Sequence, residues 1–234
     1  MKSLSGCGLF AIVLLAPLPV RADPISVVSY DVVHALASGA GGWHHAYTGS
    51  ITPTGAMNFL GPIADYTGGS GTLNDGVVGR TENDTQLFVT NSAPAITLHF
   101  DHAHRVSTIA LLGGDIFNNS LPGAIEGTVT VTANGMTARL PVKPFGRING
   151  AGTDHFPIND LLAFAGSPLD GLVTNRITLS GFQSSIVSEA VSDRLFSITE
   201  IQVNGAADPV PEPATLLLVG SALALGSLRA RRRR

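Results

Sequence analysis

The stretch Ala95–Phe100, which reads Ala-Ile-Thr-Leu-His-Phe, decides the fold class of this chain. Ile96, Leu98 and Phe100 fall on one face of an extended backbone, and the residues between them fall on the other. Period two with one apolar face is typical of an antiparallel strand that packs on a core with one side and meets solvent with the other. Such a strand needs partners elsewhere in the sequence.

Partner strands are predicted on both sides of this stretch. Val129 and Val131 alternate with threonines in the same way, and Asn134-Gly135 after them is a strong signal for a two-residue hairpin. Short runs of this kind, separated by Gly, Pro, Asn and Asp, are typical of an antiparallel β-sandwich or jelly roll. We expect one all-β domain over residues 23–209, with strands at Ile25–Val33, Leu87–Thr90, Ala95–Phe100, Val106–Leu112, Gly127–Ala133, Thr137–Lys143, Arg176–Ser180 and Leu195–Val203.

Three segments lack a clear strand pattern. Residues 155–165 fit either a short helix capped by Asn159 or a buried strand. Gly39–Gly42 and Gly68–Gly71 have the composition of flexible loops.

Residues 1–22 have the composition of a secretory signal peptide. Lys2 supplies the positive start, Gly8–Leu18 is apolar, and Val20–Ala22 fits a small-residue cleavage site. We therefore expect export and cleavage after residue 22. The chain's one cysteine, Cys7, would leave with the signal peptide, so the mature protein would depend on its core instead of disulfides.

The charge of the chain is unevenly distributed. The net charge is −3, from 14 basic and 17 acidic residues. Five of the basic residues are arginines among the last six positions and two lie within residues 1–22, so residues 23–209 keep seven basic and 16 acidic residues, about −9 in net charge. An acidic domain argues against nucleic acid or anionic lipid as a partner and is compatible with neutral sugars, cations or basic proteins.

The C-terminal end has three parts in a fixed order. Val210-Pro211-Glu212-Pro213 is a rigid turn, because its prolines fix φ and block a helix from extending backwards. Ala214–Leu228 is an apolar run in which we expect a single helix. At about 1.5 Å per residue this run covers about 22 Å, less than the roughly 30 Å hydrocarbon core of a membrane. The terminal arginines favour the cytoplasmic side.

This tail, residues 210–234, resembles the PEP-CTERM sorting signal of exported bacterial proteins. The resemblance implies processing by an exosortase, a transient inner-membrane intermediate, and delivery to the cell surface or extracellular matrix. That class is associated with exopolysaccharide production, which implies a role in the matrix or biofilm and an exopolysaccharide or another matrix component as a partner. An ordinary C-terminal membrane anchor is the alternative.

The order of motifs over about residues 55–205 resembles the galactose-binding-like jelly roll of discoidin domains. An early turn at Leu73–Gly76 precedes the strands Ala95–Phe100 and Val106–Leu112, and Leu195–Val203 closes the domain. In that family the aspartate of the early turn and the closing glutamate can bind a structural Ca²⁺. The resemblance implies that Asp75 and Glu200 take these roles.

Glu200 also lies at a break in the alternation of the closing strand. The apolar residues change from even positions, Phe196 and Ile198, to odd ones from Ile201 onward, which requires a bulge or twist. Glu200 can therefore point inward and, with Asp75 and loop carbonyls, supply the oxygen ligands that Ca²⁺ prefers. Alternatively, Asp75 only holds its turn and Glu200 is solvated.

Two groups of histidines are further candidates. His99, His102 and His104, with Asp101 among them, have a spacing compatible with zinc, and the alternative is solvated histidines in a turn that reverses the chain. The sequence has no His-Glu-x-x-His pattern that would pair such a metal with a general base.

The loop Trp43-His44-His45 can form a sugar platform, or Trp43 can pack as an anchor with exposed histidines. The sequence has no Gly-x-Ser-x-Gly elbow, no Walker loop and no cysteine after residue 7, and we assign no catalytic residue. We therefore expect a non-catalytic binding or structural protein. The alternative is a secreted metal-dependent or carbohydrate-active enzyme.

Overall fold

The computed structural model describes residues 23–79, 81–114, 125–145, 157–184 and 194–205. The expected signal peptide, the sorting motif and the C-terminal apolar helix lie outside the described residues. Every strand pairing within the described part is antiparallel, so the prediction of an all-β antiparallel fold is confirmed. No helix in this part of the chain is long and apolar enough to span a membrane.

Strands dominate the described residues, together with three short 3-10 helices, η1 (Ala40–Gly42), η2 (Glu82–Asp84) and η3 (Thr90–Ser92). The strands are β1 (Pro24–Ile25), β2 (Val27–Leu36), β3 (Ser50–Asn58), β4 (Gly61–Gly69), β5 (Gln86–Val89), β6 (Ala95–Gly114), β7 (Thr128–Ala133), β8 (Met136–Pro141), β9 (Lys143–Phe145), β10 (Pro157–Ala163), β11 (Val173–Ser180), β12 (Leu195–Ile198) and β13 (Glu200–Gly205).

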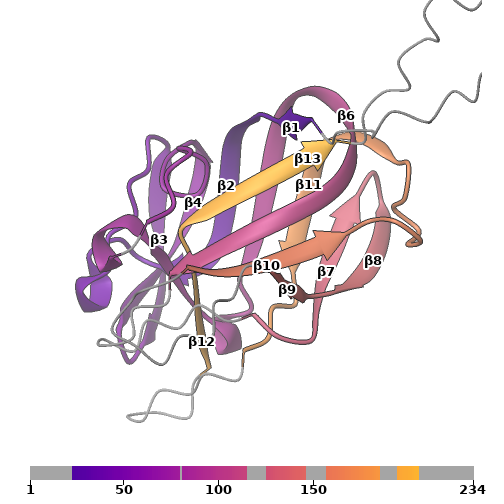
Figure 1. Cartoon of the computed structure of the whole chain (residues 1–234). Helices are drawn as coiled ribbons and strands as arrows, with labels where there is room; N and C mark the ends of the chain where they lie inside the picture. The colour runs from indigo at the N-terminus through magenta and orange to yellow at the C-terminus, as the bar shows by residue number, and fades with distance from the viewer. Residues whose placement is uncertain (1–22, 80, 115–124, 146–156, 185–193, 206–234) are drawn as a thin grey trace, which may run out of the picture.

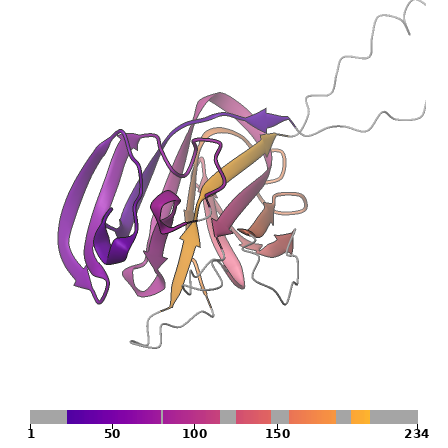
Figure 2. The same ribbon diagram turned by 60° about the vertical axis from the view of Figure 1, so that its left-hand side comes forward.

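One long strand, β6, holds two layers of the molecule together. Its first half pairs with β2 and β11 in the layer β3-β4-β2-β6-β11-β7-β8. Its second half pairs with β10 and β13, to which β9 and β1 are added at the two edges. Figure 1 shows β6 curling over between these two sets of partners, and Figure 2 shows the same arrangement turned by 60°. A separate short pair, β5 with β12, completes the sheet structure.

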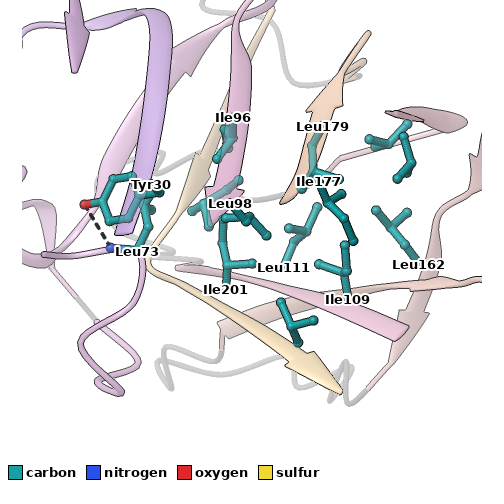
Figure 3. Packing of buried hydrophobic residues seen from close by; sticks show 14 of the residues in the cluster. Tyr30, Leu73, Ile96, Leu98, Ile109, Leu111, Leu162, Ile177, Leu179 and Ile201 are labelled. Atoms are coloured by element: carbon teal, nitrogen blue, oxygen red, sulfur yellow. Dashed lines mark hydrogen bonds between the residues drawn. The ribbon is translucent and has the colours of Figure 1, made fainter. Parts of the chain in front are cut away.

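The hydrophobic core lies between the two halves of β6. Ile96 and Leu98 from the first half belong to the same buried cluster as Ile109 and Leu111 from the second half (Figure 3). The alternation read from Ala95–Phe100 is therefore present, with its apolar side chains buried and the intervening ones partly exposed.

The prediction of two strands with a reversing turn between them is wrong in one respect, because strand structure continues through residues 95–114. The irregularity lies in what we call the β6 bend, residues 100–104. His99 pairs with Arg176 and His104 with Thr174, so the four residues Phe100–Ala103 oppose Asn175 alone. Such a bulge bends a strand without ending its pairing, and here it carries β6 from one layer to the other.

The hairpin predicted at Asn134-Gly135 is confirmed. It joins β7 and β8 with Ala133 paired to Met136, and both loop residues have positive φ, 49° and 77°. This is the geometry of the two-residue turn that Asn-Gly favours. Of the two alternatives for residues 155–165, the strand is present over Pro157–Ala163.

The edge hairpin of β3 and β4 was not predicted. Its outer strand is exposed along nearly its whole length and contains Pro53 and Gly55, so it has no apolar alternation to detect. The prediction that Gly68–Gly71 forms a flexible loop is also wrong, because this stretch contains the end of β4 and packs closely against a neighbouring segment. Gly69 ends β4, and a side chain at Gly71 would collide with the carbonyl of Ala46.

Candidate functional site

A hollow opens on the outer face of the sheet where the β6 bend meets β11. It has a volume of about 290 Å³ and is lined by His99, Phe100, Asn134, Asn175 and Arg176. We call it the outer hollow. It lies beside the bulge, where four residues of β6 oppose Asn175 alone and the pairing of the two strands is interrupted.

Two of the polar groups of the outer hollow, His99 and Asn134, are held in place by hydrogen bonds. His99 Nε2 lies 2.8 Å from Asp31 Oδ2 on β2, which orients the imidazole. Asn134, at the tip of the β7–β8 hairpin, donates to the carbonyl of Val173 at 2.9 Å and accepts from Thr174 Oγ1 at 3.1 Å. The exposed Asn175 and Arg176 add an amide and a guanidinium to the rim.

Sequence reasoning missed Asn175 and Arg176. Asn134 was noticed only as a turn residue. The pairing of β6 with β11, which brings these groups to His99, leaves no local signal in the sequence.

A second polar group lies at the outside of the β6 bend. His102 Nδ1 is 2.9 Å from Asp101 Oδ2, and His104 Nε2 is 2.8 Å from Asp101 Oδ1. The two imidazole rings lie 3.9 Å apart between centroids. Hydrogen bonds, first from His104 and then from His102, hold the pKa of the Asp101 carboxyl below its ordinary value. His99, the third histidine of the predicted zinc group, is paired with Asp31 instead.

A third candidate lies at the start of β13, where the predicted break in alternation is present. β12 ends at Ile198 and β13 begins at Glu200, because the N–H and Oγ1 of Thr199 both bond to the carbonyl of Leu112, at 2.7 and 3.0 Å. Each of the two strands pairs with a different neighbour. The change of partner places Glu200 inside the molecule, 4% exposed.

The turn of Asp75 lies against Glu200. Gly76 N–H donates to Glu200 Oε2 at 3.2 Å, and Asp75 Oδ1 accepts from Val77 N–H at 2.8 Å within its own turn. Burial raises the pKa of the Glu200 carboxyl to about 7, a shift that the Gly76 hydrogen bond opposes and the nearby Asp75 charge reinforces. Glu200 and Asn74 also line a hollow of about 370 Å³. The Glu200 carboxyl, bonded by the backbone N–H groups of Gly76 and Asp75 and close to the Asp75 carboxylate, offers oxygen atoms of the kind that a hard cation prefers.

The structure removes His45 from the predicted platform of Trp43, His44 and His45. His45 is 4% exposed, and its Nε2 lies 2.8 Å from Tyr30 Oη. Burial lowers the pKa of His45 to about 3, so its ring is neutral at neutral pH. Trp43 is partly buried against the small cluster of Leu36, Ile63, Leu87, Val89 and Leu195, and of the three loop residues only His44 is exposed. The packed-anchor alternative therefore holds for Trp43, but not for His45.

Three tyrosines that sequence reasoning did not single out surround His45. Tyr47 Oη donates to the carbonyl of Tyr30 at 2.6 Å, and Tyr66 Oη donates to the carbonyl of Leu36 at 2.9 Å. Tyr30 Oη also accepts from Leu73 N–H at 3.4 Å (Figure 3). This network fastens the loop to β2 and β4.

The C-terminal tail of the chain matches a known protein family. Residues 209–234 match the PEP-CTERM protein-sorting motif, which confirms the prediction for the tail. No curated protein matches the chain.

Among solved structures, the chain is similar to a family 32 carbohydrate-binding module of C. perfringens NanJ in complex with galactose. The identity is 14%, the match covers 68% of this chain and 93% of that one, and the TM-score is 0.36. It is also similar to a GH31 module, CBM32-2, bound to GalNAc, with 10% identity, 68% and 96% coverage and a TM-score of 0.33. A third neighbour is CBM32-3 from a family 31 glycoside hydrolase of Clostridium perfringens, with 13% identity, 52% and 74% coverage and a TM-score of 0.29.

Proposed function

We propose that this chain is an exported protein, sorted by an exosortase through its C-terminal tail, whose β-domain binds a glycan of the cell surface or extracellular matrix without turning it over. The match of residues 209–234 to the sorting motif supports the first half of the proposal. The outer hollow supports the second half, and it replaces the Trp43 loop as the ligand site.

The outer hollow has the chemistry that a neutral sugar requires. Sugar hydroxyls both donate and accept hydrogen bonds, and the rim offers amides at Asn134 and Asn175, a guanidinium at Arg176 and an imidazole at His99. Its volume of about 290 Å³ lies near the lower end of ligand pockets, roughly 300 Å³, so it suits one sugar unit of a longer chain. His99 is already held by Asp31, so this imidazole needs little ordering when a ligand binds.

Glycan-array screening of the protein beside two arginine variants tests this half of the proposal. Arg176→Ala removes a group from the rim, and Arg139→Ala removes the same charge from an exposed position on β8. We expect Arg176→Ala to weaken binding at least about tenfold, the loss of one charged hydrogen bond, and Arg139→Ala to leave it unchanged. Equal binding by the Arg176→Ala variant would remove the outer hollow as the site, and hydrolysis of a bound glycan would favour the enzyme alternative.

Intact-mass spectrometry of the exported protein tests the sorting half. We expect the surface form to lack Arg229–Arg234 and most of the apolar run, because processing of this tail by an exosortase is part of the proposal. Retention of the arginines in the released protein would contradict it.

The proposal includes a structural Ca²⁺ at Asp75 and Glu200. The two carboxylates would hold the ion, and it would join the early turn to the last strand by neutralising a buried charge. If this ion is bound, adding Ca²⁺ should raise the free energy of unfolding of the domain.

A further inference from the structure

The strongest unassigned chemistry in the described part of the chain lies at the β6 bend. Asp101, His102 and His104 each offer one metal-binding atom, and these atoms lie within 4.8 Å of one another. They form the one group of three or more such side chains in the described residues. We call it the Asp101 cluster.

The bend explains why these three residues meet. In a regular strand Asp101 and His102 would point to opposite faces. Here residues 100–103 bulge past Asn175, which releases them from that alternation and lets both histidines turn toward one carboxylate. The cluster is thus built into the feature that joins the two layers of the fold.

The contacts of the cluster place its ligand atoms close to the separation that a metal ion requires. Each imidazole bonds a different oxygen of Asp101, at 2.9 Å for His102 and 2.8 Å for His104. Ligand atoms of a tetrahedral ion bonded at about 2.0–2.1 Å lie about 3.3 Å apart, so only small side-chain movements are needed to admit an ion. His102 is largely exposed and free to make them, whereas His104 is 22% exposed and is more firmly placed.

The charge at the cluster favours a cation. Its hydrogen bonds hold the pKa of Asp101 below the ordinary value, so the carboxylate is ionised at neutral pH. Neutral imidazole and carboxylate together are the ligands of borderline ions such as Zn²⁺ and Cu²⁺, whereas Ca²⁺ and Mg²⁺ prefer oxygen alone.

We propose that Asp101, His102 and His104 bind one divalent transition-metal ion, of the class of Zn²⁺ and Cu²⁺, on the outer surface of the β6 bend. Three protein ligands leave at least one coordination position for water or for a donor from another molecule. The site is distinct from the outer hollow and from the Asp75 turn, and it does not depend on the glycan proposal.

Titration of the full-length protein, purified in detergent without a polyhistidine tag, tests the proposal. Zn²⁺ affinity is measured by calorimetry with a competing chelator, and Cu²⁺ binding by electron paramagnetic resonance. We expect one ion per chain and a copper spectrum with hyperfine coupling to two imidazole nitrogens. His102→Ala and His104→Ala should each weaken Zn²⁺ binding at least about tenfold and remove one nitrogen from the spectrum.

His44→Ala is the matched control, because His44 is an exposed histidine outside the cluster. It should bind Zn²⁺ as the wild type does. The proposal is overturned if the wild type binds no ion, if either cluster variant binds as tightly as the wild type, or if His44→Ala loses as much affinity. Circular dichroism of the variants checks that a loss is not caused by unfolding, and Asp101→Asn provides an additional conservative change at the third ligand.

Discussion

Asp101 and Glu200 are two carboxyls placed at strand irregularities, and the fold gives them opposite properties. Asp101 lies on the outside of the β6 bend, where two histidines bond it and its pKa is lowered. Glu200 follows the break between β12 and β13 and is buried, so its pKa is raised to about 7. The comparison shows that an irregularity in a strand can place a carboxyl outside or inside the molecule, depending on which neighbours the flanking segments pair with.

The largest effect is expected from the pH dependence of Glu200. Its pKa is about 7 in the folded protein against about 4.5 ordinarily, so between these values the folded state keeps a proton that the unfolded state has lost. The resulting stabilisation is fully present below about pH 4.5 and is lost as the pH rises through about 7. It amounts to at most about 3 kcal/mol in the free energy of unfolding.

Urea unfolding of the wild type and Glu200→Gln between pH 4.5 and pH 8 measures this effect. The amide cannot titrate, so the difference between the two proteins should narrow toward low pH. A difference that stays constant across the whole range would mean that the Glu200 carboxyl is not protonated in the fold.

Calcium should bind the same carboxyl, and its effect on the free energy of unfolding should be slightly smaller. An ion bound only to the folded state stabilises it by RT ln(1 + [L]/Kd), about 2.7 kcal/mol at a hundredfold excess over Kd. We expect Ca²⁺ to raise the melting temperature of the wild type and to lower the pKa of Glu200, which reduces the pH dependence described above. Glu200→Gln should abolish the rise in melting temperature.

Asp101→Asn is the control for the calcium experiment, since it makes the same change at the exposed carboxyl. It should retain the full response to Ca²⁺. Absence of any calcium effect on the wild type would remove the proposed ion from the Asp75 turn while leaving the transition-metal proposal intact.

The smallest effect is expected from the titration of Asp101, and it has the opposite sign to that of Glu200. Its pKa is lowered in the folded protein, so its stabilisation is present above the ordinary carboxyl pKa and is lost as the pH falls through the folded value. Carbon-detected NMR titration of the side chain measures this directly. His104→Ala should move the Asp101 pKa back toward its ordinary value, because His104 makes the leading hydrogen bond. A pKa that does not move would show that His104 is not the cause.

The candidate residues show where sequence reasoning reached its limit. The break at Glu200 was predictable because the alternation of a strand is local, and its change of phase is visible in a few residues. The burial of His45 was not, because the tyrosines that enclose it come from β2, β4 and its own loop. The outer hollow was missed because Arg176 meets His99 only when β11 pairs with β6.

The sequence by itself determined the fold class, the Asn134-Gly135 hairpin and the sorting tail, since each of these depends on a period or motif carried by neighbouring residues. Only the tertiary structure decided that residues 95–114 form one bent strand, that His45 is buried, and that Asp101, His102 and His104 converge. Those outcomes depend on which strands pair and in which register. Local side-chain patterns specify the face of a strand, but long-range pairing specifies its neighbours.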